Sequence, residues 1–387
     1  MNIFTHTPRL LAEVRKGYTS FRGNDVLWAK ITPCMQNGKS AVVQGLTNGV
    51  GFGSTEFHVI RAGTKALPQF LWAVLSMPRL LYAAQGAFTG SSGHQRVPAS
   101  FLEQLEIPLP PVNVQSRLIA ELDAARAERD RALAEAECLL TTFESWAIKQ
   151  MGLLPPKADD RKVYAIKRSA AGVRIDPFYH SPEFIEIERT IHAVSHAPLG
   201  SLVQFSSETW NRKEHSEATF RYIEISGVDR RRGQASASEI SVADAPSRAR
   251  MVVQPDDIIV SLTRPHHGSI ALLNKAHEGC IASTGFAVIR SVDGDQISRT
   301  YLWAALRLSL SLKQMLRRAS GGNYPAITQD ELAKVLIPLP DKSTQKKIAE
   351  EVIHRNNEAD RLEARAETAW REARERFEQQ LLNGNKT

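Results

Sequence analysis

The chain has 387 residues, of which 42% are hydrophobic and 24% charged, so it is long enough for two or three hydrophobic cores. It carries 49 Lys and Arg against 42 Asp and Glu, a formal charge of +7 that permits a polyanionic partner. No apolar run reaches the roughly 18 residues of a membrane-spanning helix and no signal peptide is apparent, so we expect a cytoplasmic protein. Cys34, Cys138 and Cys280 match no zinc or redox spacing and are expected to be reduced thiols.

The first elements of the chain predict a mixed α/β domain over residues 1–110. Half-alternating, β-branched residues at 25–33 (DVLWAKITP) and 53–61 (GSTEFHVIR) are typical of strands. A short helix is expected around residues 71–73 (LWA), and the stretch TGSSGHQRV at 89–97 predicts a glycine loop. At 107–110 the chain reads Ile-Pro-Leu-Pro, whose prolines predict a stiff, extended entry into the next element.

That next element is predicted to be a long helix at 111–152, because almost forty residues pass without Gly or Pro before Gly152. Alternating steps of four and three residues place apolar side chains in one narrow stripe, and the residues off the stripe are nearly all charged. The stripe predicts pairing with another helix through a set of residues that includes Leu118, Leu122, Ala132, Ala136 and Leu139.

The remainder of the chain repeats this plan. Ile-Pro-Leu-Pro returns at 337–340, and 337 minus 107 gives 230. DIIVSLTRP at 257–265, ASTGFAVIR at 282–290 and LWA at 302–304 follow the first copy at offsets of 229 to 232. A Gly/Ser-rich stretch, TGSSGHQRV at 89–97 and RASGGNYPAI at 318–327, precedes each Ile-Pro-Leu-Pro as the fifth landmark, and five landmarks in one order indicate a duplication. A second α/β domain is therefore predicted at 153–340 and a second long helix at 341–387, with a stripe that includes Ile348, Val352, Leu362, Ala366 and Ala369.

The predicted fold class is α+β: two mixed α/β domains separated by two long helices that form an antiparallel coiled coil, related by a pseudo-two-fold repeat of about 230 residues. A helix of about 38 residues would be roughly 57 Å long and would hold the two domains at its ends. The alternative is that each helix packs only on its own domain. Trp72 and Trp303 occupy equivalent positions and are expected in the cores.

Each globular unit ends in Ile-Pro-Leu-Pro-x(4)-Gln, with Gln115 and Gln345 opening the long helices. In this, the chain resembles the specificity subunit of type I restriction-modification systems. DVLWAKITPCMQNGKSAVV and GFGSTEFHVIR are similar to target-recognition sequence of that family. The resemblance implies a non-catalytic subunit without cofactors, in which each target-recognition domain binds one half of a bipartite double-stranded DNA site. It also implies two methyltransferase (modification) subunits and a restriction (translocase and nuclease) subunit as partners.

The two copies differ at their beginnings. About 75 residues, including RIDPFYHSPEF and HAPLGSLVQF, precede the repeated part of the second unit, whereas only about two dozen precede Asp25. The first target-recognition domain is therefore expected to be truncated at its N-terminus, which puts its part in DNA recognition in question. A truncated or silent specificity subunit that assembles without full recognition is one alternative function. A coiled-coil adaptor that binds proteins is another.

Candidate DNA-binding residues lie on the predicted loops, where Lys and Arg would contact phosphates and polar side chains would contact base edges. The alternative for each candidate residue is that it is a solvated turn residue without a role in binding. The run Arg230, Arg231 and Arg232 could equally clamp phosphates or form a solvated turn. The candidates are Lys30, Asn37, Lys39, His94, Gln95 and Arg96 in the first unit and Arg264, His266, His267, Ser269, Arg317, Arg318, Asn323 and Tyr324 in the second.

Catalytic motifs do not emerge from the sequence. DPFY at 176–179 lacks the second proline of an amino-methyltransferase motif, and PDD at 255–257 has no nuclease-type Glu-x-Lys after it. His266, His267 and His277 lack metal-site spacing, and no phosphate-binding glycine loop is present. The sequence therefore predicts neither an enzyme nor a metal site.

Overall fold

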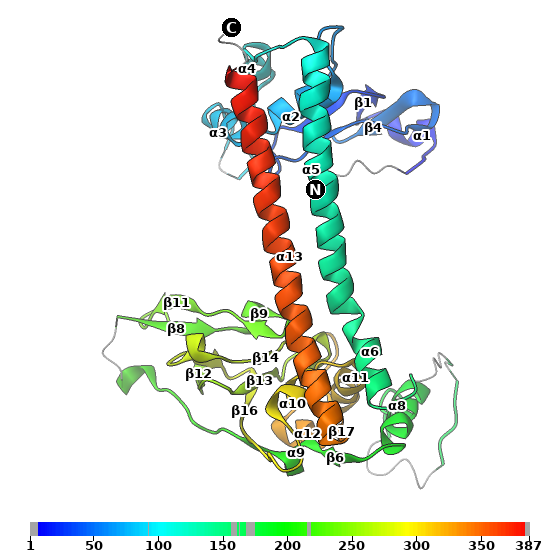
Figure 1. Ribbon diagram of the computed structural model, residues 1–387, viewed down its shortest axis with the longest axis vertical. Helices are drawn as coiled ribbons and strands as arrows, with labels where there is room; N and C mark the ends of the chain where they lie inside the picture. The colour runs from blue at the N-terminus through cyan, green and yellow to red at the C-terminus, as the bar shows by residue number, and fades with distance from the viewer. Residues whose placement is uncertain are drawn as a thin grey trace. The chain divides into compact units, whose positions relative to one another are not determined.

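The computed structural model describes residues 7–91, 93–155, 161, 163–167, 175–214 and 218–383 (Figure 1). The chain forms two compact units. Unit 1 comprises Met1–Ala134 and Leu362–Thr387, and unit 2 comprises Glu135–Arg361. Each unit therefore contains a globular part and a stretch of both long helices. As the duplication predicts, both globular parts mix strands and helices.

In unit 1 a three-stranded antiparallel sheet lies beside a two-stranded one. The central strand of the larger sheet is β2, and its four residues are all buried. Helices α2 and α3 cover one face of this strand, and the two-stranded sheet covers the other. The elements are α1 (Leu11–Val14), β1 (Thr19–Arg22), β2 (Val26–Ala29), β3 (Ser40–Val42), η1 (Thr47–Gly49), β4 (Val50–Gly53), β5 (Phe57–Ile60), α2 (Pro68–Leu75), α3 (Pro78–Gly86) and α4 (Ala99–Glu103). β2 pairs with β3 and β5, and β1 pairs with β4.

Unit 2 is larger and has two four-stranded sheets, ordered β14-β13-β16-β7 and β11-β8-β15-β12. Its helices and 3-10 turns are α8 (Pro182–His192), α9 (Leu199–Leu202), η2 (Arg212–Glu214), η3 (Ile225–Gly227), η4 (Pro265–His267), η5 (Lys275–His277), α10 (Arg299–Leu306), α11 (Ser309–Arg318) and α12 (Gln329–Leu332). Its strands are β6 (His196–Pro198), β7 (Val203–Phe205), β8 (Thr219–Ile223), β9 (Val228–Asp229), β10 (Gln234–Ala235), β11 (Ser238–Ser241), β12 (Ala249–Val252), β13 (Ile258–Ser261), β14 (Ile270–Leu272), β15 (Ile281–Ser283), β16 (Phe286–Val292) and β17 (Leu336–Pro338).

The duplication extends to single hydrogen bonds. The buried carboxylate of Asp25 accepts from the backbone N–H of Arg22 at 2.7 Å and from Arg61 at 2.7 Å. Asp257 accepts in the same way from the backbone of Gln254 and from Arg290, both at 2.8 Å. In each unit the aspartate thus joins the turn before the central strand to an arginine, which directly follows β5 in unit 1 and lies on β16 in unit 2.

The repeated glutamines have one structural role. Gln115 is fully buried, donates from Nε2 to the carbonyls of Lys65 and Pro110, both at 2.8 Å, and accepts from Leu67 N. Gln345 donates to the carbonyls of Gln296 and Pro340, both at 3.0 Å, and accepts from Ser298 N. The side chain therefore ties the end of Ile-Pro-Leu-Pro to the loop that precedes α2 in unit 1 and α10 in unit 2.

The long helices are α5 (Val112–Thr141) followed by α6 (Phe143–Gln150), and α13 (Lys342–Asn383). In unit 1 the start of α5 packs against the end of α13, since Leu118 and Leu122 share a core with Phe377 and Leu381. In unit 2 the residues of α6 share a core with Ile348 and Val352 at the start of α13. The helices therefore run antiparallel, as predicted, and each is also part of a domain core (Figure 1).

Most residues predicted for helix pairing are buried or half-buried. Leu118, Leu122, Ala136, Ile348, Val352 and Ala366 are buried, and Ala132, Leu139 and Leu362 are half-buried. Ala369 is exposed, so its assignment to the stripe was wrong. Trp370, one residue further on, packs in the core of unit 1 with Ala373, which the predicted alternation also reaches, because 3.6 residues per turn departs from a strict alternation of three and four.

Candidate functional site

Two loops join in unit 2 to form one exposed surface. The first follows β13 and carries Arg264 in the left-handed region (φ 46°) before η4. The second is the glycine loop between α11 and α12. Arg264 N donates to Pro325 O at 2.7 Å and Ile327 N to Leu262 O at 2.9 Å, so the backbones of the two loops are joined like adjacent strands. The loops therefore present their side chains from one scaffold.

The side chains on this surface are those that suit nucleic-acid recognition. The guanidinium of Arg264 lies 4.2 Å above the ring of Tyr324 and donates to Asn323 O at 3.3 Å. Tyr324 is 72% exposed and Asn323 is also exposed. Arginine can donate to guanine or phosphate, asparagine can pair with adenine, and a tyrosine ring can stack. Four predicted residues, Arg264, His267, Asn323 and Tyr324, therefore reach solvent together.

Burial and neighbouring positive charges favour the neutral form of both histidines of η4. Burial lowers the pKa of His266, with the charges of His267 and Arg264 adding to the effect. The pKa of His267 is likewise lowered, by burial and by Arg230 and Arg264. A neutral imidazole keeps one donor and one acceptor, so His267, which is exposed, can accept or donate a hydrogen bond to a base edge.

Unit 1 builds the same pair of loops. Thr32 N donates to Gln95 O at 3.0 Å and Val97 N to Lys30 O at 2.9 Å. Asn37, Lys39 and His94 are exposed, and Lys30 and Gln95 are half-buried. Arg96 forms a two-pronged ion pair with Glu56, and these hydrogen bonds hold the pKa of Glu56 below its ordinary value against the opposing effect of burial. Arg96 therefore has a structural partner but stays 42% exposed.

Three predicted residues do not face solvent. Ser269 is 2% exposed, since it stands at the start of the buried strand β14. Arg317 donates to Tyr179 O at 2.7 Å, lies over that ring and pairs with Glu188. Arg318 lies 3.7 Å from Glu188 and 3.5 Å from Glu331. The prediction that these arginines contact phosphate is wrong, because they join α11 to α8 and α12 instead.

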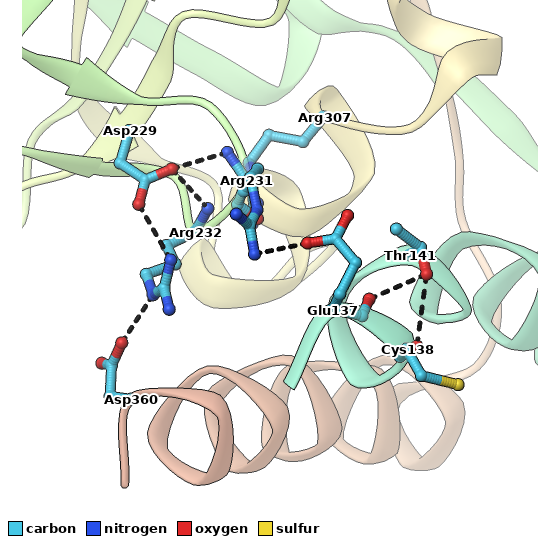
Figure 2. A network of polar contacts seen from close by, with 8 residues as sticks. All are labelled: Glu137, Cys138, Thr141, Asp229, Arg231, Arg232, Arg307 and Asp360. Carbon is cyan, nitrogen blue, oxygen red and sulfur yellow. Dashed lines mark hydrogen bonds and ion pairs between the residues drawn. The ribbon is translucent and has the colours of Figure 1, made fainter. Parts of the chain in front are cut away.

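The hairpin formed by β9 and β10 contains the Arg230–Arg232 run, for which the sequence left open a phosphate clamp or a solvated turn. Arg232 is buried and places Nε 2.5 Å from the carboxylate of Asp360 on α13. Arg231 pairs with Glu137 on α5 at 2.6 Å. Figure 2 shows both arginines turned from the hairpin toward these helix carboxylates. The hairpin is therefore an anchor between the sheet and the helices of unit 2.

Burial and hydrogen bonds shift the pKa values of Asp229 and Arg307 at this anchor. Burial alone would raise the pKa of Asp229, but the backbone N–H groups of Arg231 and Arg232 and the Arg232 side chain outweigh it and lower the pKa. Burial lowers the pKa of Arg307 to about 10. Arg307 donates to the carbonyls of Arg230 and Arg231 and lies 4.8 Å from the ring of Trp303.

Trp303 itself, predicted to be a core residue, is 4% exposed and donates from Nε1 to Gly233 O at 3.1 Å. Its counterpart Trp72 is only half-buried.

Metal-ligating clusters of three or more His, Cys, Asp or Glu side chains do not occur in the described part of the chain. Within the same residues, every helix is too short or too polar to cross a membrane. Cys34, Cys138 and Cys280 are free thiols, and burial raises the pKa of Cys280.

Comparison with known proteins relates part of the chain to a known family. Residues 198–357 match the family model described as type I restriction modification DNA specificity domain. Two relatives from Escherichia coli, the type I restriction enzyme EcoEI and EcoAI specificity subunits, are 44% and 43% identical over 108 residues. Each match covers 28% of this chain and 18% of the relative, so less than a fifth of the relatives' length is matched.

One solved structure has the same fold over most of the chain. It is described as "Structural basis underlying complex assembly and conformational transition of the type I R-M system", with a TM-score of 0.52 and 20% identity, over 95% of this chain and 83% of that one. The fold is thus of the class with two α/β units and paired long helices. The match to the DNA specificity domain model lies within unit 2, and over 108 residues the chain is similar to specificity subunits of type I restriction enzymes.

Proposed function

We propose that this chain is the DNA-recognition subunit of a cytoplasmic type I restriction-modification complex. It reads a bipartite double-stranded site and positions methyltransferase and restriction subunits without performing catalysis itself. The target-recognition domains are residues 1–110 and 153–340, and the helices at 111–152 and 341–387 set the spacing between the half-sites.

The observation that carries the proposal is the joined loop pair of each unit. Both pairs are held by backbone hydrogen bonds between equivalent residues, at Thr32 and Gln95 in unit 1 and at Arg264 and Pro325 in unit 2. The exposed side chains on them differ completely between units, which suits two different half-sites on one scaffold. In unit 1 the proposed contacts are Lys30, Asn37, Lys39, His94, Gln95 and Arg96, and in unit 2 they are Arg264, His266, His267, Asn323 and Tyr324.

A salt titration tests this proposal. Affinity of the chain, assembled with its methyltransferase, for a fluorescein-labelled cognate duplex is measured by fluorescence anisotropy between 50 and 200 mM salt. Because phosphate contacts release counterions, affinity should fall steeply with salt. Lys39→Ala and Arg264→Ala should each weaken binding by about fivefold or more. Lys346→Ala is the matched control, since Lys346 is 76% exposed on α13 and outside both loop pairs. Equal affinities for all four proteins would contradict the assignment.

A further inference from the structure

The turn between β9 and β10 contains one arginine that does not contribute to the anchor. Arg231 and Arg232 pair with carboxylates of the long helices. Arg230 is exposed and forms no ion pair with the residues that the structure describes. Its guanidinium donates to Nδ1 of His267 in η4, with 3.4 Å between the two nitrogens. The hairpin therefore reaches the loop pair of unit 2, and Arg230 is the side chain that makes this contact.

This contact determines which nitrogen of His267 carries the proton. A guanidinium can only donate hydrogen bonds, so Nδ1 of His267 is the acceptor and is unprotonated. In the neutral ring the proton is then on Nε2, which is left as a donor. Burial and the charges of Arg230 and Arg264 favour this neutral form by lowering the pKa of His267. Because His267 is exposed, it offers an N–H group to a ligand.

The neighbouring arginine, Arg264, is held in one orientation. The ring of Tyr324 lies 4.2 Å from the centre of its guanidinium, and Nη2 donates to Asn323 O at 3.3 Å. The backbone N–H of Arg264 donates to Pro325 O at 2.7 Å. The remaining N–H groups of its side chain have no partner among the described residues. Arg264 therefore presents a planar set of donors whose position is already fixed.

The backbone of Arg264 supports the same interpretation. Its φ of 46° lies in the left-handed region, which is unfavourable for residues other than glycine. In the described part of the chain, the other such residues with positive φ are Asn24, Asn48 and Asp256, whose short polar side chains tolerate this region well. An unfavourable conformation at an arginine persists only where the surrounding structure imposes it, and such places are often functional.

The donors of Arg264 and His267 select among the four bases. In the major groove guanine presents two adjacent acceptors, N7 and O6, whereas adenine presents one acceptor beside a donor. Thymine presents one acceptor beside a methyl group, and cytosine presents a donor. A planar arginine matches both acceptors of guanine at once and would meet a donor on adenine or cytosine. A guanine therefore suits Arg264 best, and the N–H of His267 requires an acceptor nearby.

A phosphate would also accept hydrogen bonds from Arg264, but the geometry favours a base. A phosphate can be contacted by any flexible Lys or Arg and gives no sequence information. Arg264 is stacked, hydrogen-bonded and held in an unfavourable backbone conformation, which together restrict it to one plane. A flat base edge requires such a restriction, because its acceptors lie in one plane.

We propose that unit 2 reads a guanine through Arg264 and an acceptor on an adjacent base through Nε2–H of His267. Arg230 is the positioning residue that holds the histidine ring and its tautomer. This inference rests on the proposed function, since it names a base that one half of the recognition site must contain. It also adds Arg230, which belongs to neither loop pair, to the residues that determine specificity.

The first test uses the full chain assembled with a type I methyltransferase subunit to select duplexes from a randomised DNA library. The bound duplexes of the wild-type chain should share a split motif. Arg264→Gln should change one position of it, from a G·C pair to an A·T pair or to no preference, because a glutamine amide suits adenine. Arg189→Gln is the matched control, since Arg189 is 72% exposed on α8 and outside both loop pairs. It should leave the motif unchanged.

The outcomes separate the two proposals. A wild-type chain that selects no motif would overturn the proposed function and this inference with it. A split motif in which Arg264→Gln alters no position, or alters an A·T pair, would overturn this inference alone. Weaker binding of every sequence by Arg264→Gln, with an unchanged motif, would identify a phosphate contact and would also overturn it.

A single-atom change in the DNA tests the contact directly. Replacing the guanine by 7-deazaguanine removes the N7 acceptor and keeps base pairing. Fluorescence anisotropy with the selected duplex should show about tenfold weaker binding by the wild-type chain. The same replacement should change binding by Arg264→Gln less than about twofold. An equal loss in both proteins would mean that another residue contacts N7, contrary to the proposal.

The role of Arg230 is tested by a double-mutant cycle with His267. Arg230→Ala and His267→Ala should each weaken binding of the selected duplex, by about threefold and about tenfold. Because Arg230 acts through the histidine, the double variant should bind no more weakly than His267→Ala alone. Additive losses, together with a smaller salt dependence in Arg230→Ala, would make Arg230 an independent phosphate contact and overturn its positioning role.

Discussion

Gln115 and Gln345 show how one side chain can define a domain boundary. Each buried glutamine side chain both donates and accepts hydrogen bonds. These bonds attach the Ile-Pro-Leu-Pro segment to a loop of its domain. An alanine leaves those backbone groups buried and without partners. The repetition of this residue in the sequence therefore has a structural cause, and function need not be invoked for it.

Gln345→Ala should lower the free energy of unfolding by about 3 kcal/mol, because a buried N–H and two carbonyls lose their partner. Gln345→Glu keeps the acceptor for Ser298 N but loses the donor, and it should be destabilised as well. Urea denaturation followed by circular dichroism measures both changes. Gln379→Ala, an exposed position on the same helix, should leave stability within about 0.5 kcal/mol. A wild-type stability of Gln345→Ala would contradict this role.

Asp25 gives a prediction for acid stability. Its hydrogen bond from Arg61 lowers the pKa below the ordinary value of 3.8, against the opposing effect of burial. Because the folded-state pKa is lowered, the ion pair stabilises the fold above pH 3.8, and this contribution is lost as pH falls further. Arg61→Leu should therefore be less stable than wild type at pH 7, and the difference should shrink below pH 3.8. Denaturant titrations from pH 7 to pH 2.5 measure this, and a pH-independent difference would refute it.

Solvent exposure of single polar residues was the hardest feature to predict. Arg317 and Ser269 have the residue types of DNA contacts, and nothing local in the sequence distinguishes them from Arg264. Arg317 is turned away from solvent by its ion pair with Glu188, which is far from it in the sequence and next to it in the fold. By contrast, the exposed set around Arg264 and Tyr324 was predictable, because a glycine loop and a turn at fixed offsets in both copies mark the same place.

At the scale of elements, the helix stripe was predictable in outline and not in detail. The absence of Gly and Pro predicts two long helices, and the structure has them. The first is interrupted at Thr142, where the Thr141 and Thr142 hydroxyls donate to carbonyls one turn earlier and Arg355 donates to Leu139 O and to Thr142 Oγ1. Such competing bonds bend helices, and they depend on a partner helix that the sequence does not place.

Ala366→Glu and Ala369→Glu form a matched test of this stripe. Ala366 is 4% exposed, and a glutamate there would bury a charge without a partner and cost about 3 kcal/mol. Ala369 lies three residues away on the same helix and is exposed, so glutamate there should change stability by less than about 0.5 kcal/mol. Thermal unfolding followed by circular dichroism at 222 nm compares the two proteins. Equal melting temperatures would show that α13 does not pack through Ala366.

The whole chain is two copies of one fold whose exposed loops have diverged. The shared part, with Asp25 and Asp257 or Gln115 and Gln345, was visible in the sequence because identical contacts require identical residues. The unequal part was visible only as a difference in length before each copy.

Two diverged loop pairs predict that the two halves of a recognition site can be altered separately. Under the proposed function, genomic DNA from cells that express the chain together with a type I methyltransferase subunit should carry a split methylation motif with a fixed spacer, read by long-read sequencing. Exchanging Asn323 and Tyr324 for Ala should relax only one half of the motif, because these exposed side chains belong to the loop pair of unit 2. Asn37→Ala with Lys39→Ala should affect only the other half, and a change of the same bases by both pairs would contradict the division of labour.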